Sequence, residues 1–490
     1  MENLSVLTCS VMLLISSISA PVATADGSKN NSDSKIHYEP TWESLARHDA
    51  SPQWYDDAVL GIYFHWGVYS VAGMGEWYAQ RMYAPKKDPY HSGDLAYHKK
   101  TYGDPCTEFG YHDFVPMFKA EKWDPNLWAD LFKHAGADFA GPVVEHHDGF
   151  AMWDSEIDEY NAMDMGPHRD ITGEMAVAVR ERGMKFLTAF HNLRWSWRDV
   201  GRKLCPEGVG INDPKYSGLY GPVHKPGDPM TAEFKQEWLD KMIEVIDKYQ
   251  PDEIYLEGDI CKPAGDEYAL PFLAHYFNSA RKWGKDVVVT HKKDDLPQSC
   301  SPLDMEGSSL REPARERWQT DHTILNKWYW AYDVHAKCLP VNRLIDGIVD
   351  RTSKNGVTLL SIGPKADGTI PDDQIEVLLE IGNWMIINKE ALYGADPAPF
   401  CEGGVDTWRA GSLRFTEKGG YLYAIELDMP KAGMVIPGVT PVQGSRIRML
   451  GSNQDIAWHQ DGGNVVIDGI PDPLPCDYAW SFKIPLQPPK

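Results

Sequence analysis

Carboxylic acids at two places in this 490-residue chain are candidates for chemistry. Glu257 and Asp259 follow the predicted strand at 253–256, and Glu306 lies in the short segment DMEG at 304–307. Two facing carboxyl groups, one that donates a proton and one that attacks or acts as a base, can cleave a glycosidic bond. We therefore take Glu257, Asp259 and Glu306 as the candidate catalytic residues.

Histidines form the second group of candidates, and they too lie at the ends of apolar runs. They are His65, His146, His147, His191 and His291. Imidazole both donates and accepts hydrogen bonds, as a sugar hydroxyl requires, so we predict that these side chains contact a sugar. Histidines bonded to backbone groups are the alternative.

A metal site is not expected among these histidines. Adjacent residues of a regular strand point to opposite faces, so His146 and His147 cannot both point inward from a strand. His65 and His191 would have to assist, and no carboxylate is evidently placed among them. We therefore predict neither a metal nor another cofactor.

The apolar runs that precede these candidates alternate with amphipathic segments. Strands are expected at 59–66, 139–144, 184–191, 253–256, 286–290 and 356–362, and helices at 171–182, 233–249, 343–353 and 373–388. Buried strands that alternate with helices predict an α/β fold, a (β/α)8-like TIM barrel, over residues 37–395. In such a barrel, functional groups collect at the carboxyl ends of the strands.

Beyond residue 395 the pattern changes to short alternating runs, such as 421–425 and 465–467, separated by Gly, Pro and Asp. This pattern is typical of an antiparallel β-sandwich. We expect a small C-terminal β-sandwich domain at 396–490.

The N-terminal segment has the features of a secretory signal. Residues 4–20 are mostly apolar and are followed by Ala23-Thr24-Ala25, so we expect a signal peptide at 1–25 with cleavage before Asp26. Residues 26–36 are rich in Ser, Asn, Asp and Lys and are predicted to be a disordered leader. The protein is thus expected to be secreted or periplasmic, with a few disulfides at most and at least one free thiol.

The composition excludes some partners. The formal net charge of -23 argues against nucleic acid, whose binding requires many Lys and Arg side chains, and against anionic membranes. No segment after the signal is long and apolar enough to span a membrane. The 18 Trp and 23 Tyr residues suit carbohydrate, since flat aromatic faces pack on sugar rings. A homo-oligomer is left open.

Longer motifs carry a family resemblance. Residues 61–70 (GIYFHWGVYS), 76–78 (EWY), 145–155 (EHHDGFAMWDS), 318–321 (WQTD) and the blocks between 344 and 394 resemble glycoside hydrolase family 29, the α-L-fucosidases. The resemblance implies a retaining exo-glycosidase that removes terminal α-L-fucosyl residues from glycans or glycoconjugates through a covalent intermediate. It also implies sugar contacts from His65, Trp77, His146 and His147, to which we add Tyr78 and Trp153 of the same motifs.

The chief departure from the family concerns the nucleophile, which is normally an Asp. In the segment YLEGD at 255–259, Glu257 stands in the Asp position, and its extra methylene extends the carboxylate by about 1.5 Å. Three interpretations follow. Glu257 is the nucleophile, or Asp259, two residues on and on the same strand face, has taken its role, or the protein binds sugar without hydrolysing it.

The acid/base residue and the sugar are less directly indicated. Glu306 is favoured as the acid/base, because Gln319 stands where other relatives carry a Glu after the Trp and an amide cannot donate as an acid. Residues 290–293 (THKK) differ from the Asn-Asp-Arg-like sequence of relatives. Another α-L-glycoside, of the L-galactose or L-glucose type, is therefore an alternative substrate.

Overall fold

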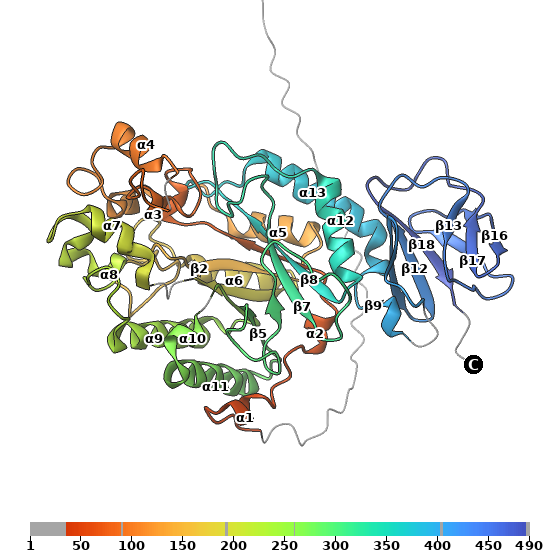
Figure 1. Ribbon diagram of the computed structural model, residues 1–490, viewed down its shortest axis with the longest axis horizontal. Coiled ribbons are helices and arrows are strands. Elements are labelled where there is room, and N and C mark those ends of the chain that lie inside the picture. The colour runs from red at the N-terminus through yellow and green to blue at the C-terminus, as the bar shows by residue number, and fades with distance from the viewer. Residues whose placement is uncertain (1–35, 90–91, 192–194, 259, 402–404, 487–490) are drawn as a thin grey trace, which may run out of the picture. The chain divides into compact units, whose positions relative to one another are not determined.

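Eight parallel strands close into a barrel in the computed structural model, which describes residues 36–89, 92–191, 195–258, 260–401 and 405–486 (Figure 1). The strands are β1 (Leu60–Phe64), β2 (Phe139–Glu145), β3 (Lys185–Phe190), β4 (Glu253–Leu256), β5 (Val288–Lys292), β6 (Leu303–Asp304), β7 (Trp318–Thr323) and β8 (Gly356–Ile362). Neighbours in sequence pair in parallel, and β8 closes the barrel on β1. The predicted barrel is confirmed, and β6 and β7 are the strands that the sequence analysis did not predict.

The strands are connected by helices of very different lengths. The helices are α1 (Trp42–Leu45), α2 (Gln53–Asp56), α3 (Tyr78–Arg81), α4 (Asp94–Thr101), α5 (Pro125–His134), α6 (Ile171–Glu181), α7 (Asp199–Leu204), α8 (Ser217–Tyr220), α9 (Ala232–Tyr249), α10 (Cys261–Ala264), α11 (Asp266–Trp283), α12 (Val341–Thr352) and α13 (Asp372–Asn388). Short 3-10 turns include η3 (Tyr111–Met117) and η4 (Trp195–Arg198). The four predicted helices correspond to α6, α9, α12 and α13.

Helix α9 shows why the helices could be predicted from the sequence. The hydroxyl of Thr231 accepts a hydrogen bond from the backbone N–H of Phe234 and so caps the first turn. The helix ends at Tyr249, and the next residue, Gln250, adopts the left-handed conformation. Its apolar side chains recur at helical spacing and are buried.

The barrel interior is filled by alternate residues of the strands. Tyr63, Tyr255, Val288, Val357 and Leu359 belong to one buried apolar cluster. Because side chains alternate along a strand, these positions fix which later residues point into the barrel mouth. In β5, every second residue from Val288 to Lys292 points into the barrel.

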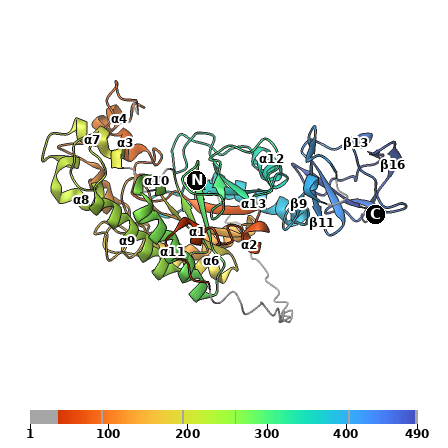
Figure 2. The same ribbon diagram turned by 60° about the horizontal axis from the view of Figure 1, so that its bottom comes forward.

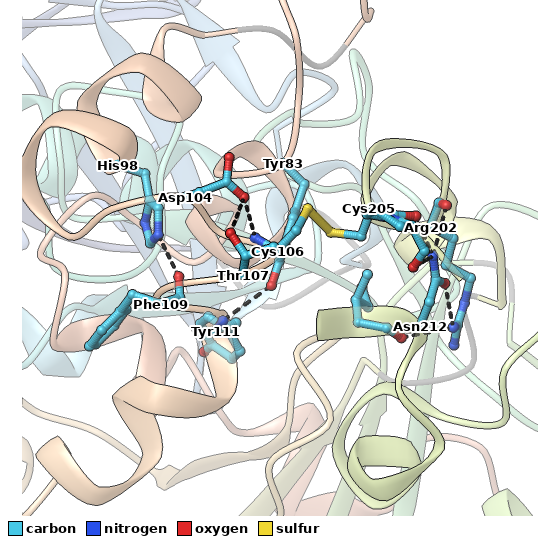
Figure 3. Close-up of a disulfide and its surroundings, with 12 residues drawn as sticks. Tyr83, His98, Asp104, Cys106, Thr107, Phe109, Tyr111, Arg202, Cys205 and Asn212 are labelled. Carbon is cyan, nitrogen blue, oxygen red and sulfur yellow. Dashed lines mark hydrogen bonds between the residues drawn. A yellow bond between two sulfur atoms is a disulfide. The ribbon is translucent and has the colours of Figure 1, made fainter. Parts of the chain in front are cut away.

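A disulfide between Cys106 and Cys205 joins two long excursions from the barrel, one between β1 and β2 and one between β3 and β4 (Figure 3). It connects the segment after α4 to the C-terminal end of α7. Nearby, the Tyr83 hydroxyl accepts a hydrogen bond from the Tyr111 backbone N–H at 3.1 Å. Cys261, Cys300, Cys338, Cys401 and Cys476 are free thiols, as the expectation of at least one free thiol requires.

Antiparallel strands follow the barrel (blue in Figures 1 and 2). They are β9 (Asp396–Pro397), β10 (Arg409–Ala410), β11 (Leu413–Lys418), β12 (Tyr421–Glu426), β13 (Met434–Ile436), β14 (Ile447–Met449), β15 (Asp455–Ile456), β16 (Trp458–Asp461), β17 (Asn464–Ile467) and β18 (Trp480–Pro485). They form a seven-stranded and a three-stranded sheet that share one apolar core. The predicted antiparallel β-domain is therefore present.

The predicted signal peptide and nearly all of the predicted leader lie outside the described residues. Within the described ranges, no helix has the length and apolar character needed to cross a membrane.

Candidate active site

A cavity of about 230 Å³ opens at the carboxyl ends of the barrel strands. Its lining residues come from seven of the eight strand ends or the loops that follow them. They are His65, Glu76, Trp77, Arg81, His146, His147, His191, Glu257, Lys292, Glu306, Asp321, Trp328 and Trp330. Two of the three predicted catalytic residues and five of the eight predicted sugar contacts line it.

Lys292 lies at the centre of the acidic side of this cavity. Its Nζ contacts Glu257 Oε2 directly and lies 3.3 Å from Glu306 Oε2 and 3.5 Å from Asp321 Oδ1. The Lys292 side chain is only 3% exposed, whereas that of Glu306 is 41% exposed. One buried ammonium group thus holds three carboxylates around the same point.

Strand alternation explains why Lys292, and not His291, faces the cavity. Strand β5 extends to Lys292, two residues beyond the predicted end, and Val288 and Lys292 have the same parity. His291 points to the opposite face, where its Nδ1 lies 2.7 Å from Ser301 Oγ. His291 is fully buried and does not line the cavity, and burial lowers its pKa to about 4.

The titration of these groups follows from burial and from their mutual charges. Burial raises the pKa of Glu257, and the charges of Asp321 and Glu306 act in the same direction, while Lys292 opposes them. Burial also works against ionisation of Asp321, but Lys292 and hydrogen bonds with Asp304 and Tyr63 lower its pKa. The surrounding carboxylates in turn raise the pKa of Lys292 in spite of its burial, so it carries a proton at neutral pH.

Glu257 is held by groups on its own strand and on the two strands that flank it. It follows β4, and its backbone N–H donates to the carbonyl of Phe190 in β3 at 2.9 Å. The Tyr255 hydroxyl donates to Glu257 Oε2 at 2.8 Å. With Lys292, these contacts fix the carboxylate at the mouth of the barrel.

Glu306 projects from the loop after β6, where the backbone is unusual. Its φ is 34°, in the left-handed region that few side-chain-bearing residues adopt, and Gly307 follows with φ of 63°. The backbone N–H of Glu306 donates to Asp304 Oδ1 at 2.8 Å. A Cβ atom on Gly307 would lie 2.1 Å from the Trp328 ring, so glycine is needed there.

Gln319 lies in the barrel interior and has a supporting role. Its Oε1 accepts a hydrogen bond from Tyr55, and its Nε2 donates to Asp304 Oδ2 at 3.2 Å. Asp304 also accepts from the backbone N–H of Asp321 at 2.9 Å. This network connects the two strands that carry Glu306 and Asp321.

Imidazoles form the opposite side of the cavity. His65 Nε2 lies 3.3 Å from His191 Nε2, and His65 Nδ1 lies 2.9 Å from Ser361 Oγ. The ring of His146 lies 4.7 Å from that of His191. Burial lowers the pKa of His65 and His191 well below the usual value, so both are neutral at neutral pH.

Both members of the His146-His147 pair line the cavity, against the expectation that only one could point inward. Strand β2 ends at Glu145, and the pair lies in the turn that follows, where strand alternation no longer applies. Ligand atoms of His65, His146 and His191 lie within 4.8 Å of one another, a spacing compatible with a metal ion. Both His65 nitrogens are already within hydrogen-bond distance of a protein partner, Nδ1 of Ser361 and Nε2 of His191.

Glu76, Arg81 and Trp328 also line the cavity, and the sequence analysis did not select them. Glu76 Oε2 accepts hydrogen bonds from the backbone N–H groups of Trp330 and Ala331, and its Oε1 is buried without a hydrogen-bond partner. The guanidinium of Arg81 lies 5.8 Å from the Trp77 ring. Trp328 is 59% exposed at the edge of the cavity.

Two further predicted residues lie outside the cavity. The Tyr78 hydroxyl lies 2.8 Å from His98 Nδ1, and the indole N–H of Trp153 donates to Glu244 Oε2 at 2.8 Å. Both side chains are fully buried and neither lines the cavity. Asp259 lies outside the described residues.

Comparison with known proteins identifies the family. A sequence model described as alpha-L-fucosidase matches residues 25–390, and a second, the alpha-L-fucosidase C-terminal domain, matches 406–485. The chain belongs to the α-L-fucosidase family. It is therefore a glycoside hydrolase, and the resemblance to glycoside hydrolase family 29 is confirmed.

Individual relatives match over most of their length. Tissue alpha-L-fucosidase of Rattus norvegicus is 30% identical over 91% of this chain and 92% of its own length. Plasma alpha-L-fucosidase of Homo sapiens is 28% identical over 92% of this chain and 93% of its own length. The crystal structure of Thermotoga maritima alpha-fucosidase superimposes with a TM-score of 0.72 at 29% identity, covering 91% of this chain and 100% of that one. The same enzyme in complex with fucose gives the same TM-score at 28% identity.

Proposed function

We propose that this family member removes terminal α-L-fucosyl residues with retention of configuration, with Glu257 as nucleophile and Glu306 as general acid and base. The observation that supports this pair is the position of Lys292, whose Nζ contacts both carboxylates. Since both oxygens contact one nitrogen atom, they lie closer together than the roughly 6.5 to 9.5 Å that inverting enzymes require.

The proposed first step forms a covalent glycosyl-enzyme. Glu257 attacks the anomeric carbon while Glu306 protonates the leaving glycosidic oxygen. The burial of Glu257 and the exposure of Glu306 agree with these roles, because the nucleophile meets the sugar inside the cavity and the acid reaches the aglycone at its edge.

In the proposed second step Glu306 takes a proton from water, and that water attacks the anomeric carbon and releases Glu257. Lys292 favours the ionised form of the departing carboxylate, since its charge lowers the pKa of Glu257. The sequence of steps requires only these side chains and water.

The opposite side of the cavity suits recognition of the sugar. His65, His146, His147 and His191 present ring nitrogens that can donate to or accept from hydroxyl groups. The free Oε1 of Glu76 adds a buried acceptor. We propose that this side binds the sugar hydroxyls and that the exposed Trp328 contacts the aglycone.

Trapping with 2-deoxy-2-fluoro-α-L-fucosyl fluoride, followed by peptide mapping, tests the proposal. We expect one label per chain, on Glu257. A label on Asp259 would reassign the nucleophile, and binding of fucose with no label and no turnover of an activated aryl fucoside would favour a sugar-binding protein. Aryl glycosides of α-L-galactose and α-L-glucose should be cleaved more slowly than the fucoside; a reversed order would overturn the choice of sugar.

We further propose that residues 1–25 are a signal peptide and 26–36 a leader, that the catalytic domain covers 37–395 and the β-domain 396–490, and that the protein is secreted or periplasmic. Mass spectrometry of the exported protein should give a mature chain that begins at Asp26. The expected partners are fucosylated oligosaccharides or polysaccharides, and sedimentation velocity would establish whether the protein is a homo-oligomer.

A further inference from the structure

We propose that a second cavity, between helix α12 and the outer face of β7 and β8, binds a small oxyanion through the guanidinium groups of Arg351 and Arg343. This cavity has a volume of about 280 Å³. No acidic residue lines it within the part of the chain that the structure describes. The ligand chemistry is a carboxylate, sulfate or phosphate oxygen that accepts from guanidinium N–H groups.

Arg351 is the residue that points to a ligand. Its side chain is 9% exposed, yet no hydrogen bond or ion pair from any described residue reaches its guanidinium, and its Nε is buried without a partner. Burial lowers its pKa to about 10, which leaves it charged at neutral pH. A buried charge without a partner is costly, so an anion at this point would offset a real energetic penalty.

The nearest carboxylate on the same helix is already engaged. Asp350 lies 2.5 Å from Lys354 Nζ and 2.7 Å from Arg414 Nε. The charge of Asp350 also favours the charged form of Arg351, as do those of Asp304 and Asp321 from inside the barrel. Among the described residues, Asp350 therefore acts on the Arg351 guanidinium at a distance, and its own ion pairs are made with Lys354 and Arg414.

The local sequence of α12 leaves room for the Arg351 guanidinium beside the cavity. Gly347 lies one turn before Arg351, and a Cβ atom there would approach Arg351 Nη1 to 3.0 Å. Arg343 lies one turn earlier still and lines the same cavity. On β7, alternation turns His322 outward to this cavity while Asp321 points inward. The pKa of His322 is lowered by burial and then by the charges of Arg351 and Arg343, which indicates a positive field.

The cavity lies behind the loop that carries Glu306. Gly307, Ser308 and Ser309 form one of its walls. Thr320 Oγ1 donates to the Ser308 carbonyl at 2.9 Å, and Lys354 Nζ donates to Ser309 Oγ at 2.6 Å. A bound anion would stabilise this loop, and in this respect the inference depends on the proposed role of Glu306.

Calorimetric titration of the full chain with sodium sulfate, phosphate and butyrate, at constant ionic strength, tests the inference. We expect saturable binding, with a dissociation constant roughly in the millimolar range. Tighter binding of sulfate or phosphate would identify an inorganic oxyanion, and tighter binding of butyrate an organic acid that also uses the apolar wall.

The variants separate a built site from a general salt effect. Arg351→Met should weaken binding at least about tenfold, and Arg343→Gln severalfold, since each removes a charge-assisted hydrogen bond. Arg343 is exposed, so this variant should fold even if Arg351→Met does not. The exposed Arg446 of the β-domain supplies a control, Arg446→Gln, which should bind like the wild type.

Heat that rises without saturation, or equal binding by the wild type and Arg343→Gln, would overturn the proposed site. The effect on the loop that carries Glu306 is measured separately, by following kcat as the anion concentration is raised. We expect kcat to change about twofold or more, with a midpoint at the dissociation constant of the anion. Binding to Glu306→Gln should be unchanged, so failure of the catalytic assignment and failure of the anion site give different results.

Discussion

The two sides of the active-site cavity use opposite electrostatic designs. On one side a buried ammonium contacts three carboxylates, and charge interactions within this group raise the pKa of Lys292 and help to lower that of Asp321. On the other side, buried imidazoles are neutral and lie within hydrogen-bond distance of one another and of a serine. Charged groups on one side can stabilise the charge that develops when a glycosidic bond is cleaved. Neutral imidazoles on the other side can donate hydrogen bonds to the sugar hydroxyls and accept them.

This contrast predicts the largest effect at Glu257. Glu257→Gln preserves shape but removes the nucleophile, so kcat for an aryl α-L-fucoside should fall by roughly 10³-fold or more. Steady-state kinetics measure it, with Glu233→Gln on the exposed start of α9 as a matched control that should retain activity. A loss below tenfold would remove Glu257 from the chemistry.

The direct contact between Glu257 and Lys292 gives the second prediction. Glu257→Asp withdraws the carboxylate by about one bond length and should cost on the order of 100-fold in kcat. Adding Lys292→Arg extends the cation toward the shortened acid, so the double variant should recover at least about tenfold. If the loss in the double variant equals the product of the losses in Glu257→Asp and Lys292→Arg, the two residues act independently.

Lys292 also controls the pH profile on the acidic side. The ionised form of Glu257 is the active one, so activity falls as pH decreases through its pKa, which burial raises and Lys292 lowers. Lys292→Met removes the lowering influence, and the acid limb of kcat/KM should move to higher pH by about one unit. An unchanged limb with a lower rate would mean that Lys292 only supports the structure.

Substitutions on the imidazole side of the cavity should mainly weaken the affinity for the substrate. His191→Asn should raise KM by roughly tenfold, the cost of about one lost hydrogen bond, and change kcat less. The acid limb should stay in place because His191 is already neutral there, its pKa being well below the usual value. The exposed His459, paired with Asp468 in the β-domain, provides the control His459→Asn. A shifted limb would assign His191 to the charged network.

Several features of the site could be predicted from the sequence, because side chains alternate along a strand and the motifs are local. Strands β1 to β4 were predicted within a few residues, because their apolar β-branched and aromatic runs stop abruptly at polar residues. Lys292 and Asp321 could have been found by the same rule, since Lys292 continues the inward parity of Val288 and Asp321 that of Gln319. Strands β6 and β7 escaped prediction because one has two residues and the other is largely polar.

The sequence by itself determined the barrel, the β-domain and the family, because hydrophobic periodicity and long motifs are local properties of the chain. Only the tertiary structure decided which acids and cations meet. Lys292 gathers Glu257, Glu306 and Asp321 from three other strand ends, and Trp328 and Trp330 reach the cavity from an irregular loop. The physical reason is that charge pairing and burial depend on distances between segments far apart in the chain, which no local pattern encodes.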